Sequence, residues 1–182
     1  MGMKLPRTIR MDVSDTFVFE RAAEPGEWAV SGSFLFADAD PGALAGKPRA
    51  AFRSGLLGIA SFGWSTLAIV SAATDAERDA AADLLARQLQ DRLGAPDMAA
   101  ALAAAHEELA FAASLCNHPP QTLIAVHRIW DGRDIREQFR TLRPRESADA
   151  AHRYGPVFSF VHTEGEELAE NVDLVEIMRR GS

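Results

Sequence analysis

The sequence predicts an α+β domain in which a mostly antiparallel sheet of six to eight strands packs on a central helical hairpin. Two helical patterns follow one another between residues 74 and 117. Segments in which polar and apolar residues alternate stand both before and after these helices, as expected for strands with one buried face. Strands and helices do not alternate regularly along the chain, and this disfavours a doubly wound parallel sheet.

Strand patterns dominate the region before the helices. Residues 7–13 and 16–20 alternate polar and apolar side chains, and residues 28–36 follow a turn at Pro25-Gly26. We expect these three segments to form an antiparallel meander. Residues 65–71 are mostly apolar and predict one more strand.

Three helices are expected in the middle of the chain. A short one over 48–55 has proline in its first turn and glycine at its end. Thr74 and Glu77 form a capping box that starts a long helix, which ends at Gly94. Asp97 places a negative charge at the start of the next helix. The apolar stripe of that helix is rich in alanine, so we expect close packing.

The pattern changes to strands again after the helices. Residues 122–129 alternate with a period of two and are mainly apolar on both faces, which predicts a central strand. Asp131-Gly132 is the strongest hairpin signal in the chain, and residues 135–142 form the returning strand.

We expect residues 1–145 to form a single α+β domain. Residues 146–182 predict an appendage with a strand over 156–162 and an acidic amphipathic helix over 164–180. Positive charge collects on the hairpin and its exit, at Arg128, Arg133, Arg136, Arg140, Arg143 and Arg145. These charges are either solvated faces, or the acidic appendage docks on the hairpin of its own or a neighbouring subunit, or the hairpin binds an anionic partner.

The composition of the 182 residues excludes several classes of function. The 26 acidic residues exceed the 19 basic ones, and the net charge of −7 opposes general nucleic-acid binding. A single cysteine cannot form an internal disulfide, which favours a reducing cytoplasm. No apolar run has the length of a signal peptide or a membrane span. We therefore expect a cytoplasmic protein without nucleic-acid or membrane partners.

Two incomplete motifs also carry little weight. His106-Glu107-Glu108-Leu109-Ala110 begins like a zinc-protease motif, but Ala110 replaces the second histidine that would bind the metal. Gly58 and Gly63 have the spacing of a phosphate-binding loop, but Trp64 stands where the lysine is needed. We expect no metal, no cofactor and no catalytic residue.

The end of the second long helix is the best candidate for a site. The negative end of a helix raises the pKa of a thiol, so Cys116 is a poor nucleophile there. In a structural interpretation Cys116 is buried, Asn117 is a left-handed cap and Pro119 keeps His118 extended. The alternative is a ligand site shared with the following strand. Its binding residues are then Cys116, Asn117, His118, His127, Arg128 and Trp130.

Several short blocks of the sequence, taken in their order along the chain, carry a resemblance to a known family. They cover residues 5–12, 15–20, 23–30, 111–120 and 136–142. With these blocks the chain resembles an uncharacterised bacterial family of small proteins of unknown function, over about residues 4–145. The resemblance implies no activity, ligand or catalytic residue.

Two functional hypotheses follow from the residues. The first is a non-catalytic cytoplasmic accessory or protein-binding domain that self-associates, with a homodimer as the first expectation and another protein as a further partner. The second is a small-molecule enzyme or ligand carrier with a pocket near Cys116, His118 and His127, gated by Trp64 or Trp130.

Overall fold

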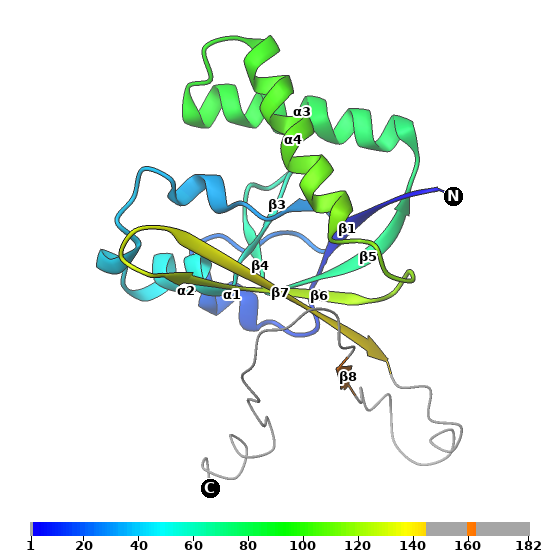
Figure 1. Cartoon of the computed structure of the whole chain (residues 1–182), viewed down its shortest axis with the longest axis horizontal. Helices are drawn as coiled ribbons and strands as arrows, with labels where there is room; N and C mark the ends of the chain where they lie inside the picture. Colours follow the sequence, from blue (N-terminus) through cyan, green and yellow to red (C-terminus); the bar gives the residue numbers. More distant parts are fainter. Residues whose placement is uncertain (1, 145–159, 163–182) are drawn as a thin grey trace, which may run out of the picture.

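The computed structural model describes residues 2–144 and 160–162 of the chain. Its organising element is a pair of long helices, α3 (Asp75–Leu93) and α4 (Met98–Ser114), which pack against each other on one side of the strands (Figure 1). Most of the strands form antiparallel pairs below this pair of helices. The predicted α+β class is confirmed.

The helical pair begins and ends where the local sequence predicts. The Thr74 hydroxyl accepts a hydrogen bond from the Glu77 amide at 3.2 Å, and the Glu77 carboxylate accepts one from the Thr74 amide at 2.8 Å. Gly94 ends α3 at a φ of +67°, which costs glycine little. Asp97 caps α4 by accepting a hydrogen bond from the Ala100 amide at 2.7 Å. The predicted helical hairpin is confirmed.

The contact between α3 and α4 is made mainly by small residues. Leu85 and Leu109 are buried beside them and belong to the same core as Leu5 of the first strand. Because alanine side chains are small, these residues allow α3 and α4 to pack closely against each other. The buried alanines are Ala81, Ala82, Ala86, Ala101, Ala105 and Ala112.

The strands divide between two sheets. The main sheet contains β1 (Met3–Ile9), β5 (Leu67–Ala73), β6 (Leu123–Trp130) and β7 (Ile135–Pro144), paired antiparallel in that order, with β8 (Phe160–His162) on the end of β7. The second sheet contains β2 (Ala29–Val30), β3 (Leu56–Gly58) and β4 (Trp64–Ser65). The expected sheet of six to eight strands is wrong, since neither sheet has six strands among the described residues.

The predicted N-terminal meander is also wrong. β1 pairs with β5 rather than with the next segment, and residues 16–20 lie largely in a helix, α1 (Ser14–Val18). The buried Asp15 explains this difference, because its carboxylate accepts hydrogen bonds from the Thr66 hydroxyl at 2.6 Å and the Thr66 amide at 3.2 Å. A long-range polar contact therefore overrides the local alternation.

Residues 28–36 contain only two residues of strand. Gly32, at a φ of +80°, turns the chain out of β2, so the alternation of the sequence does not continue as a strand. The helix expected over 48–55 is confirmed, with Gly55 following its last turn. The short helices of this region are η1 (Ser33–Phe36), η2 (Pro41–Ala43) and α2 (Gly46–Ser54).

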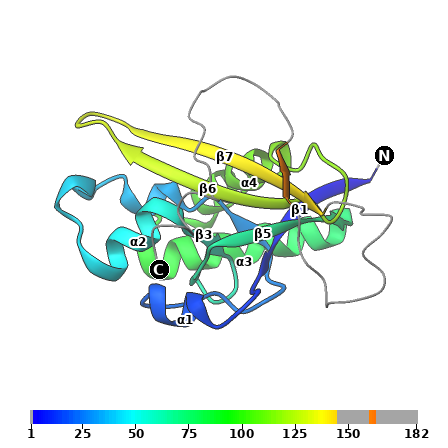
Figure 2. The ribbon, with the colours of Figure 1, turned by 90° about the horizontal axis from the view of Figure 1, so that it is seen from below.

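The predicted hairpin of β6 and β7 is confirmed. The Asp131 carboxylate accepts hydrogen bonds from the amides of Arg133 at 3.0 Å and Asp134 at 2.8 Å, and Gly132 has a φ of +91°. The tip of the hairpin extends toward the segment that contains α2 (Figure 2). This approach of hairpin and helix builds the polar cluster described below.

The appendage is described only in part. Residues 160–162 form β8, which pairs antiparallel with residues 142–144 of β7. The acidic helix expected over 164–180 lies outside the described residues. The division into a domain of residues 1–145 and a docked appendage of residues 146–182 stays a prediction.

Candidate functional site

Arg128 is the largest of the fully buried side chains, with 1% of its surface exposed. The alternation of β6 turns it to the inner face of the hairpin with Ile124 and Val126, directly opposite Glu137 of β7. The sequence groups Arg128 with the surface arginines of the hairpin, and a solvated position is wrong for it. Its neighbours decide what this buried charge does.

The Arg128 guanidinium binds three parts of the chain at once. Its Nε donates to Glu137 Oε1 at 2.7 Å. Its Nη1 donates to the carbonyl oxygens of Gly55 at 2.7 Å and Phe52 at 3.1 Å, and its Nη2 donates to the carbonyl and, at 3.1 Å, the hydroxyl oxygen of Ser31. The Ser31 hydroxyl in turn donates to Glu137. We call Arg128, Glu137, Ser31 and the two carbonyls the Arg128 cluster.

The Arg128 cluster has a structural explanation. The carbonyl oxygens at the C-terminal end of α2 have no partner within that helix, and a cation placed there also compensates the negative end of the helix dipole. Burial lowers the pKa of the Arg128 guanidinium, while the hydrogen bond and charge of Glu137 raise it. An arginine has five N–H donors. Since the cluster supplies five acceptors, Arg128 has no donor left for a ligand.

Cys116 lies sealed in the core. Only 1% of its surface is exposed, and it packs with Val70 and Ile124. Burial raises the pKa of its thiol to about 12, which the charge of Lys4 only partly opposes. The thiol is therefore protonated at neutral pH and cannot act as a nucleophile.

The residues after Cys116 close the helix in an unexpected way. Asn117 was expected as a left-handed cap, but among the described non-glycine residues only Phe62 and Gln121 have a positive φ. The prediction is wrong because α4 closes with a tight last turn, in which the Cys116 amide donates to the Ala113 carbonyl at 3.0 Å. That turn needs no left-handed residue.

The predicted site residues do not gather at one place. His118 contributes its carbonyl oxygen to Lys4 Nζ at 2.6 Å. His127 lies on the outer face of the hairpin, where burial first and the charges of nearby arginines second lower its imidazole pKa. Trp130 packs at the opposite end of β6 from Ile124, the contact of Cys116, which is about 20 Å along a strand.

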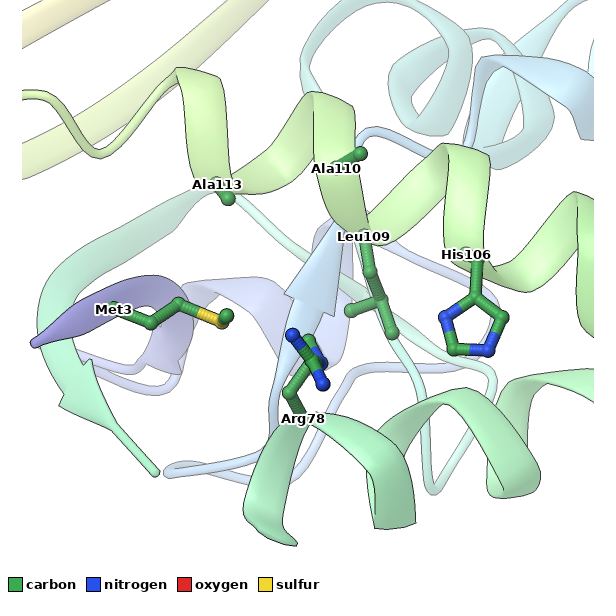
Figure 3. A pocket seen from close by; sticks show the side chains of 6 residues that line it. All are labelled: Met3, Arg78, His106, Leu109, Ala110 and Ala113. Atoms are coloured by element: carbon green, nitrogen blue, oxygen red, sulfur yellow. The ribbon is translucent and has the colours of Figure 1, made fainter. Parts of the chain in front are cut away.

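One pocket lies between α3, α4 and β1 and has a volume of about 420 Å³ (Figure 3). Its wall is mainly apolar, and His106 and Arg78 supply its polar groups. Arg78 is already paired with Asp79 at 2.8 Å, and His106 is exposed. The pocket therefore offers apolar contact but no oriented catalytic group. Its lining residues are Met3, Arg78, His106, Leu109, Ala110 and Ala113.

A second pocket of about 380 Å³ lies beside α2, β4 and the end of α3. Three cationic side chains, three aromatic rings and one carboxylate line it, and we call it the basic groove. The residues that line the basic groove are Glu20, Arg21, Phe36, Lys47, Pro48, Ala51, Phe62, Trp64 and Arg92. Neither of the two pockets is lined by Cys116, His118 or His127.

Two groups of residues escape the reasoning from sequence. The first is Glu137, which could be identified from the hairpin if its turn were centred on Gly132-Arg133, because this register places Glu137 opposite Arg128 on the same face. The second is the basic groove, which could not be predicted, because Arg21, Lys47 and Arg92 come from distant segments without a common pattern.

Within residues 2–144 and 160–162, no three His, Cys, Asp or Glu side chains are grouped so that they could hold a metal ion. No helix of these residues combines the length and apolar character needed to cross a membrane.

The fold and the cluster thus define an α+β domain held together by a buried arginine. Residues 3–154 match the model of a family of unknown function (DUF6505), and the chain belongs to this family. The resemblance found in the sequence is confirmed to this extent. No curated protein and no solved structure matches the chain.

Proposed function

We propose that the protein is a non-catalytic cytoplasmic accessory protein that acts by protein binding, first of all to a second copy of itself. The two side chains best suited to chemistry, Arg128 and Cys116, support this proposal because both have structural roles. Arg128 uses its donors within the fold, and Cys116 is sealed and protonated. What the molecule offers to a partner is therefore surface rather than reactive groups.

The outer face of the β6–β7 hairpin carries the proposal. Its cross-strand pairs are Ala125–Arg140, His127–Gln138 and Ile129–Arg136, which we call the outer hairpin face. Ile129 is 43% exposed near the end of β6, one residue before the strand ends at Trp130. An exposed apolar residue opposite an arginine, here Arg136, is typical of a protein interface, where arginine is enriched and the buried centre is apolar.

The edge of β7 adds main-chain groups to this surface. β7 pairs with β6 along one side, and β8 occupies only residues 142–144 of the other side. Among the described residues, the edge from 135 to 141 has no strand partner. An open strand edge is a template for antiparallel addition of another strand. The Arg128 cluster holds the hairpin from its inner face, so little ordering is needed on binding.

Sedimentation velocity tests the proposal with a pair of matched variants. The wild-type chain is expected to form a dimer between about 1 and about 100 μM, the range for a moderate interface. Ile129→Glu places a charge in the outer hairpin face and is expected to give a monomer. Leu84→Glu changes a residue of similar exposure on α3 (37%) and is expected to leave the dimer intact.

The outcomes of that experiment are distinct. A wild-type chain that stays monomeric at the highest concentration contradicts self-association. Equal weakening by Ile129→Glu and Leu84→Glu contradicts the location on the hairpin, because only the first variant changes the proposed surface.

A further inference from the structure

We propose that the basic groove binds a small organic anion that combines an acidic group with a flat ring system. The groove lies beside α2 and α3 and shares no lining residue with the outer hairpin face, so this inference does not depend on self-association. The argument rests on the charge, the rigidity and the size of the groove.

The charge of the groove is opposite to that of the chain. Arg21, Lys47 and Arg92 line it together with a single carboxylate, Glu20, although the whole chain has a net charge of −7. All three cations are exposed and available to solvent. A cluster of cations in a chain of opposite charge is a local attraction for an anion.

The three cations retain donors for that anion. Arg21 donates through Nη1 to the Ser61 carbonyl at 3.3 Å, and Arg92 donates through Nε to Gln88 Oε1 at 2.7 Å. These contacts orient the two guanidinium groups and leave other N–H groups of each for a ligand. A carboxylate or phosphate is the acceptor that such a fork of donors recognises best.

A rigid aromatic wall stands beside the cations. The rings of Phe36 and Trp64 stack with their centroids 5.4 Å apart and an interplanar angle of 26°. Gly32 and Gly55 fix the Trp64 ring, since an added Cβ would lie 2.8 Å and 2.7 Å from it. This wall is present before any ligand arrives and favours a flat ring.

The third ring is held in a strained conformation. Phe62 has a φ of +57°, which is unfavourable for a bulky side chain. Its amide donates to the Gly58 carbonyl at 3.0 Å, and Gly63 packs against the Ala22 backbone so closely that no side chain would fit. The guanidinium of Arg92 lies 5.1 Å from the Phe62 ring centroid. The turn thus presents an aromatic ring and a cation together.

The size of the groove limits the ligand. A volume of about 380 Å³ lies near the lower end of small-molecule sites. It accommodates a ring system with one acidic group rather than a polymer or a long chain. Aryl carboxylates and nucleoside monophosphates share this chemistry, and the test distinguishes them.

Isothermal titration calorimetry of the full chain tests the proposal with four probes. The two anions on a ring are 2-naphthoate and adenosine 5′-monophosphate, and at least one of them is expected to bind. Inorganic phosphate lacks the ring and 2-naphthalenemethanol lacks the charge, so each is expected to bind at least roughly tenfold more weakly than that anion, the factor expected when one favourable contact is lost.

Variants locate the binding in the groove. Lys47→Gln and Arg92→Gln are each expected to weaken binding of the preferred anion roughly tenfold. Arg49→Gln, an exposed arginine on α2 outside the groove, is the control and leaves affinity unchanged. Phe62→Gly relieves the positive φ, so it is expected to keep the fold while it weakens binding.

Each result decides for or against the proposal. Binding of either anion with the expected loss in Lys47→Gln, Arg92→Gln and Phe62→Gly supports it and identifies the acidic group. The proposal is overturned if neither anion binds, if the neutral alcohol or phosphate binds equally well, or if the three variants and Arg49→Gln behave alike.

Discussion

Replacement of Arg128 by methionine removes the centre of the Arg128 cluster while keeping an unbranched apolar side chain in place of the arginine stem. Glu137, whose side chain is 16% exposed, then loses its cationic partner. The carbonyl oxygens of Phe52, Gly55 and Ser31 lose their donors as well. Removing one partner of a buried ion pair costs about 3–5 kcal/mol, and we expect Arg128→Met to fall in this range.

Urea unfolding followed by circular dichroism and tryptophan fluorescence measures this loss. For a urea dependence of about 2 kcal/mol per molar, the expected loss lowers the unfolding midpoint by roughly 2 M. Arg78→Met is the matched control, because Arg78 lies on α3 outside the outer hairpin face and its ion pair with Asp79, whose side chain is 60% exposed, lies at the surface. We expect this control to lose less than about 1 kcal/mol.

A double variant separates the ion pair from the carbonyl contacts. Arg128→Met with Glu137→Leu removes both charges, so it is expected to recover part of the stability lost in Arg128→Met. The recovery should be incomplete, because the carbonyl oxygens at the end of α2 stay without donors. A loss below about 1 kcal/mol in the single variant Arg128→Met refutes the structural role of the cluster.

Three further changes test other parts of the account. Burial first, and then the charges of Glu137 and Glu107, raise the pKa of Glu108. Its contribution to stability is therefore fully present below its unfolded pKa and is lost as the pH rises through the folded pKa. Glu108→Gln should raise the Tm at pH 7 but not near pH 4, and equal shifts in Tm at the two pH values contradict this. Cys116 should react with a thiol reagent only after unfolding, and rapid labelling of the native chain contradicts its burial. Gly55→Ala should lower the free energy of unfolding by about 1–3 kcal/mol in urea, because its Cβ would lie 2.7 Å from the Ala51 carbonyl oxygen and from Trp64; an unchanged value contradicts the close contact.

The helical hairpin and the β6–β7 hairpin are predictable from sequence because their signals are local. Thr74 with Glu77, Gly94, and Asp131-Gly132 each determine a boundary through contacts within a few residues. The structure confirms each of them.

The N-terminal region is not predictable in this way because distant contacts decide its structure. Residues 16–20 alternate like a strand, yet the contact of Asp15 with Thr66 holds a helix there. β1 likewise pairs with β5, about sixty residues away. Local alternation cannot distinguish among partners at such distances.

The candidate site shows the same division. The observed loop of residues 131–134 sets the register that pairs Arg128 with Glu137, but the depth of their burial depends on α2 and Ser31, which lie far earlier in the chain. The basic groove combines five separate segments, at residues 20–21, 36, 47–51, 62–64 and 92. Its charge and rings become visible only once the fold brings these segments together.

The outer hairpin face and the edge of β7, which has no strand partner over 135–141 among the described residues, make self-association the central claim. Hydrogen–deuterium exchange at low and high protein concentration tests it directly, because it reports both association and its location. The account predicts that amides in residues 135–141 exchange more slowly at high concentration while those of α3 do not change. Exchange of residues 135–141 that is independent of concentration, over a range that covers the expected dimer, would contradict it.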